Sequence, residues 1–259
     1  MDKTSRFSIS ALKLSTTIGV ADAPLIIDVR APEDFHRDNA KIVGAVRRLP
    51  ADIFLWRDML PKDRRAVLYC TDGAASANLT AALIEVGIEA RFLAGGIDEW
   101  RRHGLPTCRK PGAYPSQWVT RERPKVDRIA CPWLIRRFID PEAVFYYVRP
   151  DNVRDFAAWS GAIPYDIEGA EFGHAGVHCS FDAFLRLYDI QDPALDHLAL
   201  IVRGADTGKP GLTPQSPGLI ALSQGLSATI ARDHQQLEHG MVMYDALYAW
   251  CRHEAGTRV

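Results

Sequence analysis

The sequence has no apolar run of the roughly 18 residues that a membrane-spanning helix needs. Its first ten residues, MDKTSRFSIS, lack the apolar core of a signal peptide. There is also no excess of one charge, because 31 basic and 32 acidic residues leave a net charge of −1. Such a balance does not favour binding to nucleic acid or to anionic membranes. These absences predict a cytoplasmic protein with no nucleic-acid or membrane partner.

Paired cysteines are missing as well. The chain has five cysteines, an odd number, at wide spacings and with no C-x-x-C pair. Zinc ribbons and disulfide frameworks are built from such pairs, so we expect neither, and we expect reduced thiols. The cysteines are Cys70, Cys108, Cys131, Cys179 and Cys251.

What is present is an ordinary globular composition, 47% hydrophobic and 24% charged, in 259 residues, a length typical of two domains. In residues 1–110, short apolar runs alternate with helical patterns. This alternation predicts an α/β domain with a parallel sheet covered by helices on both faces. Residues 111–124 are proline-rich and aperiodic, which predicts a linker. Residues 125–259 have mainly helical spacing and predict a mostly α-helical second domain.

Cys70 stands at the end of the apolar run 66–70, before a loop of small residues and a helical pattern. Ligands of open α/β sheets bind beyond the carboxyl ends of the strands, which makes Cys70 a candidate catalytic nucleophile. Backbone N–H groups of the loop would surround its sulfur with partial positive charge and stabilise a thiolate or an attached sulfur atom. The alternative is a cysteine that packs as a small hydrophobe. The predicted cradle consists of Thr71, Asp72, Gly73, Ala74, Ala75 and Ser76.

Several segments arrive in an order that resembles a single rhodanese domain over residues 8–108: IIDVRAPEDF, AKIVGAV, the loop after Cys70, and LAGGIDEW. The resemblance implies a rhodanese-like fold and a persulfide carried on Cys70. The sulfur donor and acceptor would then be a small molecule or a protein persulfide. The resemblance also implies structural roles for Asp28, Arg30, Gly95, Gly96 and Trp100.

The cysteine loop departs from the family pattern. Active rhodaneses often carry an arginine at the position of Ala75, and sometimes another beside the cysteine, where this chain has Thr71. Because Asp72 lies between these positions, a dianion such as thiosulfate would meet a carboxylate and no guanidinium. A nearby like charge also tends to raise the pKa of a thiol. We therefore expect a persulfide carrier with weak thiosulfate activity.

Basic residues gather at the end of the expected linker and directly after it, four of them within residues 121–128. Pro124 predicts a helix start that leaves Arg128 in the first turn. A helix N-terminus with arginines beside it is suited to an oxyanion, which would neutralise the guanidinium of Arg128 and of Arg121. The alternative is a solvated basic face paired with neighbouring acidic residues.

Glu171, His174 and His178 lie around two glycines, which predicts a loop before the next helix. A glutamate and a histidine together are compatible with a divalent metal such as zinc, iron or manganese. The alternative is a polar loop that caps the helix. The candidate metal ligands are Glu171, His174 and Asp206, with Asp127 and His234 as further choices.

The second half resembles the C-terminal domain of chromate-resistance proteins over residues 117–253. The segments that carry the resemblance are WVTRERPKVDRIACPWLIRRFID, GAEFGHAG, SFDAFL, IVRGADT and HGMVMYDALYAW. The resemblance implies a link to chromate, with contact to chromate or sulfate through Arg121, Arg128 and His174. The best-known members are chromate-responsive regulators with a different N-terminal region, so we do not expect DNA binding here.

These observations leave three classes of function open. The chain could be a rhodanese-type sulfurtransferase or persulfide carrier coupled to an oxyanion-responsive domain and linked to chromate resistance. It could be a non-catalytic oxyanion sensor or regulatory protein, which the missing loop arginine favours. It could also be a metal-dependent enzyme of unknown reaction in the C-terminal domain, which Glu171 and His174 favour.

Overall fold

The structure is a computed structural model that describes residues 6–257. Contacts divide the chain into two units, the first comprising Met1–Lys110 and Arg137–Pro141, the second Pro111–Arg136 and Glu142–Val259. Within the described residues, no helix has both the length and the apolar character needed to cross a membrane.

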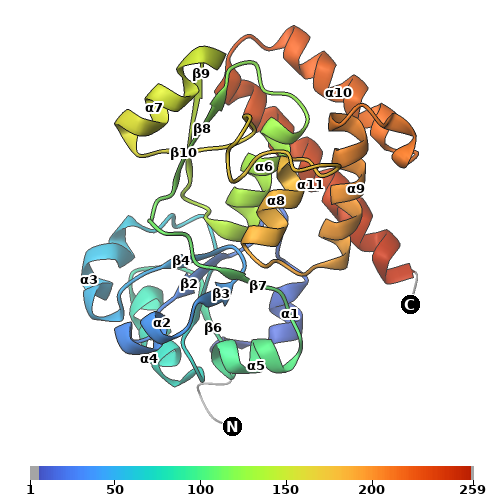
Figure 1. Ribbon diagram of the computed structural model, residues 1–259. Coiled ribbons are helices and arrows are strands. Elements are labelled where there is room, and N and C mark those ends of the chain that lie inside the picture. Colours follow the sequence, from blue (N-terminus) through green and yellow to red (C-terminus); the bar gives the residue numbers. More distant parts are fainter. Residues whose placement is uncertain (1–5, 258–259) are drawn as a thin grey trace. The chain divides into compact units, whose positions relative to one another are not determined.

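The first unit is built on a parallel sheet of five strands in the order β1-β6-β5-β2-β4. Every residue of β2 and β5 is buried, as expected for strands that are covered on both faces. Helices flank the sheet on both sides (Figure 1), which confirms the predicted α/β class. The strands are β1 (Ser8–Ile9), β2 (Leu25–Asp28), β4 (Ala45–Arg47), β5 (Ala66–Tyr69) and β6 (Ala90–Leu93).

Short helices and one antiparallel pair complete this unit. Strands β3 (Ala40–Ile42) and β7 (Thr107–Arg109) form the antiparallel pair. Ile27 and Leu68 of the sheet share one buried cluster with Trp56 and Leu83 from two of the helices, and this cluster fixes the helices on the sheet. The helices are α1 (Ala11–Ser15), α2 (Pro32–Arg37), α3 (Ile53–Trp56), α4 (Ala74–Glu85) and α5 (Gly96–Arg102), with 3-10 turns at Pro50–Asp52 and Arg57–Met59.

The second unit is rich in helices, as predicted, and also holds a small parallel sheet in the order β10-β8-β9. The long helix α11 packs against α6 and α9 (Figure 1). The strands are β8 (Gln117–Arg121), β9 (Val144–Val148) and β10 (Ile163–Pro164). The helices are α6 (Asp127–Leu134), α7 (Val153–Ser160), α8 (Ser180–Leu187), α9 (Pro193–Asp206), α10 (Ser216–Thr229) and α11 (Asp233–Thr257), with 3-10 turns at Pro150–Asn152 and Pro210–Leu212 and a π-helical turn at Ile135–Ile139.

Residues 111–124, expected to be a linker, contain the central strand of this sheet. Trp118, Val119 and Thr120 of β8 are fully buried, and the strand pairs with β9 on one side and β10 on the other. Because three consecutive residues of this strand are buried, its sequence shows no period of two, and the prolines around it favoured a linker. The expected domain boundaries themselves stay a prediction.

Candidate functional site

Cys70 directly follows strand β5, and its side chain is buried. The N–H of Gly73 donates to its Sγ at 3.2 Å, and the N–H of Ser76 lies 3.4 Å from the same atom. The Ser76 Oγ is 3.5 Å away. Two of the six predicted cradle amides therefore reach the sulfur. The amide of Ala74 instead donates to the carboxylate of Asp72 at 3.0 Å.

The carboxylate of Asp72 is the charged group that contacts the thiol. Its Oδ1 lies 3.6 Å from Sγ, within reach of a weak hydrogen bond from the thiol. The bond from the Ala74 N–H, more than any other cause, lowers the pKa of Asp72, so this exposed side chain is anionic at neutral pH. Ala75 is exposed on the first turn of α4, and its methyl group leaves the expected arginine position without charge.

Two glycines explain why the loop can close around the sulfur. Gly73 is the N-cap of α4 and has a φ of 95°, a left-handed conformation that side chains disfavour. Gly96 has a φ of 57°, and a Cβ there would lie 2.4 Å from the carbonyl oxygens of both Cys70 and Thr71. Those carbonyls accept bonds from the first amides of α5, at 3.0 Å for Cys70 and 3.1 Å for Thr71. The close approach of α5 thus holds the cysteine loop in place.

A hollow of about 330 Å³ lies beside Thr71 in the first unit. Its guanidinium groups are already engaged by carboxylates: Arg101 bonds Asp38 at 2.7 Å, and Arg37 lies 3.5 Å from Asp34. The hollow therefore offers a bound dianion no excess of positive charge. Its lining residues are Arg30, Asp34, Arg37, Asp38, Thr71, Ile97, Asp98 and Arg101.

In the second unit, three carboxylates converge on one histidine. The Nε2 atom of His174 lies 3.0 Å from Asp206, 3.3 Å from Asp127 and 3.3 Å from Asp166. Asp127 is the first residue of α6, and Asp206 is the last residue of α9. These two acids therefore come from different helices. We call Asp127, Asp166, His174 and Asp206 the Asp/His cluster.

The arginines of the predicted oxyanion site point at this cluster. Arg121 donates to Asp166 Oδ2 at 2.7 Å, and Arg128 Nε lies 3.2 Å from the same oxygen. Ser180 donates its N–H to Asp127 at 3.2 Å and its Oγ–H to the other oxygen of Asp166 at 3.1 Å. The two arginines and His174 thus lie around a carboxylate of the chain itself, and their predicted contact with an oxyanion stays a prediction.

The three acids of the cluster have pKa values that are shifted in different directions. Burial raises the pKa of Asp127 and, with the charges of Asp127 and Asp166, raises that of Asp206 to about 8. Burial acts on Asp166 too, but bonds from His174 and Arg121 outweigh it and lower its pKa. Bonds to Asp127 and Asp166 raise the pKa of His174 to about 10.

Some of the predicted metal ligands lie together and one lies apart from them. One ligand atom each of Asp127, His174 and Asp206 lies within 4.8 Å of the others, whereas Glu171 is exposed and stands outside this group. Asp166 was missed altogether. It lies in the segment YDIEG, where no motif or spacing indicates a functional residue. Its φ of 52° is in the left-handed region, which the sequence of this segment does not predict.

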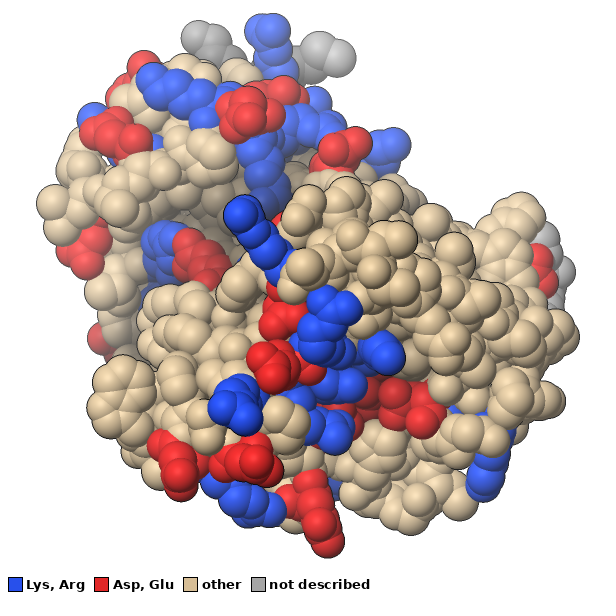
Figure 2. Space-filling view, turned by 90° about the horizontal axis from the view of Figure 1, so that it is seen from above, with Lys and Arg blue, Asp and Glu red and all other residues tan. Residues whose placement is uncertain are grey.

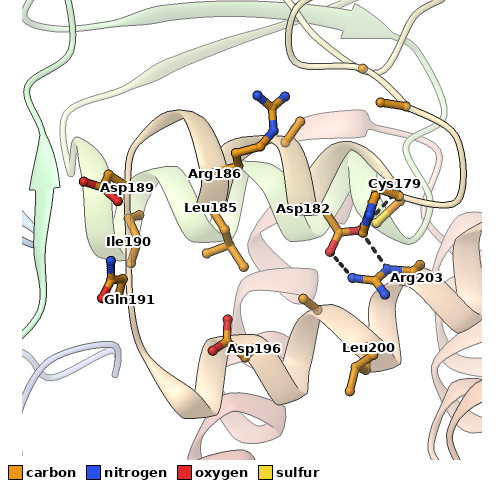
Figure 3. Close-up of a pocket in the computed structure, with 15 residues that line it drawn as sticks. Cys179, Asp182, Leu185, Arg186, Asp189, Ile190, Gln191, Asp196, Leu200 and Arg203 are labelled. Carbon is orange, nitrogen blue, oxygen red and sulfur yellow. Dashed lines mark hydrogen bonds and ion pairs between the residues drawn. The ribbon is translucent and has the colours of Figure 1, made fainter.

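A cavity of about 590 Å³ lies between α8 and α9 (Figure 3). Asp182 and Arg203 form a two-bond ion pair at one end, at 2.6 and 3.0 Å, and Asp196 lies toward the other. No residue of the Asp/His cluster lines this cavity among the described residues, so the cavity is a separate feature of the unit. On the face shown in Figure 2, basic side chains lie beside acidic ones.

The parallel sheet, the cysteine at the end of β5 and the small-residue loop define a rhodanese-like domain, and residues 11–103 match the family described as the rhodanese-like domain. Residues 118–251 match the family described as ChrB, C-terminal domain. The chain therefore belongs to the ChrB C-terminal domain family and carries a rhodanese-like domain ahead of that region. Both resemblances drawn from the sequence are confirmed.

Two relatives found by sequence agree with these matches. Protein ChrB of Cupriavidus metallidurans is 34% identical over 217 residues, which cover 82% of this chain and 61% of that protein. The chain thus spans about three fifths of that relative's length. A sulfurtransferase of Allochromatium vinosum is 32% identical over 106 residues, 40% of this chain and 96% of that protein. A rhodanese-related protein of Thermoplasma volcanium has a TM-score of 0.35 and 24% identity, over 39% of this chain and 95% of its own.

Proposed function

We propose that the first unit is a rhodanese-type persulfide carrier in which Cys70 is the nucleophile. The observation that carries the proposal is the position of Sγ, which accepts backbone bonds from Gly73 and Ser76 beyond the end of a parallel strand. Partial positive charge from these amides stabilises a thiolate, and also the terminal sulfur of a persulfide. The match to a sulfurtransferase over nearly its whole length supports the same chemistry.

The reaction has two steps. The thiolate of Cys70 attacks the outer sulfur of a donor persulfide, a sulfur–sulfur bond forms on Cys70, and the donor leaves as a thiolate. A nucleophilic acceptor then attacks the outer sulfur and restores the Cys70 thiolate. Because Asp72 is anionic and Ala75 uncharged, neutral or protein-bound persulfides are favoured as donors over the thiosulfate dianion.

We further propose that the protein acts in chromate resistance in the cytoplasm, because it belongs to the ChrB C-terminal domain family and is related to a protein named ChrB. Contact of chromate or sulfate with Arg121, Arg128 and His174 stays a prediction, and it requires that the anion compete with a carboxylate of the chain. Both guanidinium groups are bonded to Asp166, so an oxyanion must displace that carboxylate.

Mass spectrometry of the full chain tests the carrier proposal. After incubation with glutathione persulfide, wild-type protein should gain one sulfur on Cys70, and Cys70→Ser should gain none there. Cys108→Ser, which alters another fully buried thiol of the same unit, is the matched control and should behave like the wild type. Sulfur on another cysteine in place of Cys70 would overturn the assignment. Sulfur on Cys70 that no thiol or cyanide removes would favour a sensor over a carrier.

A further inference from the structure

The sulfur transfer proposed for Cys70 does not use the Asp/His cluster, whose geometry resembles a coordination sphere. Oxygen atoms of Asp127 and Asp206 and a ring nitrogen of His174 all lie within 4.8 Å of one another. Metal–ligand bonds of about 2.0–2.2 Å place neighbouring ligand atoms at most about 4.4 Å apart. Small shifts of these side chains would therefore bring all three atoms onto one ion.

The charges around the cluster leave a place for a cation. Asp166 is neutralised by Arg121 and Arg128, but within residues 6–257 no lysine or arginine pairs with Asp127 or Asp206. When both of these carboxylates are ionised, a protonated His174 leaves one negative charge in a largely buried place, which either a proton on Asp206 or a bound cation balances. Asp206 is also the last residue of α9, where the helix dipole disfavours an anion.

A buried thiol beside the cluster provides a separate observation. Cys131 lies four residues after Asp127 on α6, on the same helix face, and its side chain is fully buried. It makes no hydrogen bond within the described part of the chain. Burial raises the pKa of this thiol most. The negative charge of Asp127 raises the pKa further, as do other nearby groups that include Asp166 and Asp206, so the thiol lies close enough to the cluster to interact with its charges.

We propose that Asp127, His174 and Asp206 bind a divalent first-row transition-metal ion. One imidazole and two carboxylates suit manganese, iron or zinc, whereas magnesium and calcium prefer oxygen ligands alone. Bound metal would neutralise both carboxylates with His174 in its neutral form. Ser180 then orients one of the ligands, because its backbone N–H donates to the carboxylate of Asp127 at 3.2 Å.

Metal titration of the full chain tests this site without any assay of activity. After removal of metal with chelator, Mn²⁺ binding is followed by loss of the electron paramagnetic resonance signal of the free aqua ion, with Zn²⁺ as competitor. We expect about one Mn²⁺ per chain. Asp127→Asn and Asp206→Asn should each weaken binding more than about tenfold, since even changes to outer-shell partners have effects of this size. Glu171→Gln, in the exposed part of the same loop, should bind like the wild type.

Hydrogen exchange of the amides of α6 and α9 separates loss of a ligand from loss of the fold. In chelator, these amides should exchange no faster in Asp206→Asn than in the wild type, because the substitution removes repulsion from Asp127. With Mn²⁺ added, their exchange should slow in the wild type and stay unchanged in this variant. A wild type that takes up neither Mn²⁺ nor Zn²⁺ at millimolar concentration would overturn the proposal. So would folded Asp127→Asn and Asp206→Asn proteins that bind as the wild type does.

Discussion

Arg121 donates a hydrogen bond to the carboxylate of Asp166 at 2.7 Å and a second to the carbonyl of the same residue at 2.9 Å. Arg128 reaches the same carboxylate from the first turn of α6. A carboxylate therefore occupies the place between the two guanidinium groups where an external oxyanion would bind. Any response of this unit to chromate or sulfate depends on that internal competitor.

Replacing Asp166 should expose the arginines to oxyanions. In Asp166→Asn, both guanidinium groups lose their anionic partner and a like charge disappears, so sulfate affinity should increase about tenfold or more. Calorimetric titration of the full chain with sulfate measures this change. Asp151→Asn, an exposed acid in the same unit, changes the net charge equally and should have little effect. Tight sulfate binding that is the same in wild type and Asp166→Asn would show that the anion binds elsewhere.

The cysteine site was predictable from sequence because its parts are consecutive. A buried strand, Cys70, Gly73 and the helix behind them fall within a few residues, and local rules decide how they fold. The Asp/His cluster is different. Asp127, Asp166 and Asp206 are each about forty residues apart, and only the packing of α6 and α9 with the loops between them brings them together. No period or spacing in the sequence could reveal Asp166 as their common neighbour.

An arginine at position 75 should raise thiosulfate turnover. Ala75 is exposed on the first turn of α4, so a longer side chain can extend into solvent and approach a dianion beside Cys70. One charge-assisted hydrogen bond contributes about 1.5–3 kcal/mol, which predicts at least a tenfold gain in turnover. Steady-state assays with thiosulfate and cyanide measure the gain, with Ala75→Gln as the uncharged control. Equal rates for the wild type and Ala75→Arg would mean that the missing charge is not what limits the reaction.

Gly96 should tolerate no side chain. A Cβ there would lie 2.4 Å from the carbonyl oxygens of Cys70 and Thr71, and the φ of 57° adds strain. Gly96→Ala should therefore cost about 3 kcal/mol or more, against about 1 kcal/mol for Gly104→Ala. Gly104 is the matched control, since its φ is 62° and a Cβ there meets nothing within 4 Å. Hydrogen exchange of the amides of β5 reports the local stability, and two equally mild effects would contradict the role given to α5.

Asp28 should be far more important for stability than an acid on the surface of the same unit. It is fully buried, accepts three side-chain bonds from the buried Arg30 and a fourth from the Tyr69 hydroxyl at 2.7 Å. Asp28→Ala leaves the Arg30 charge buried with Asp38 as its one acidic partner among residues 6–257, which should cost about 3–5 kcal/mol.

Asp58, an exposed acid whose carboxylate lies 3.8 Å from Arg57, provides the comparison, and Asp58→Ala should cost less than about 1 kcal/mol. Hydrogen exchange of the amides of β2 and β5 measures both variants within the unit that they alter. The two-unit chain is not expected to unfold in a single step, so a local probe is needed. If Asp28→Ala exchanged no faster than Asp58→Ala, the buried ion pair would not be what holds the carboxyl ends of β2 and β5 together beneath the cysteine loop.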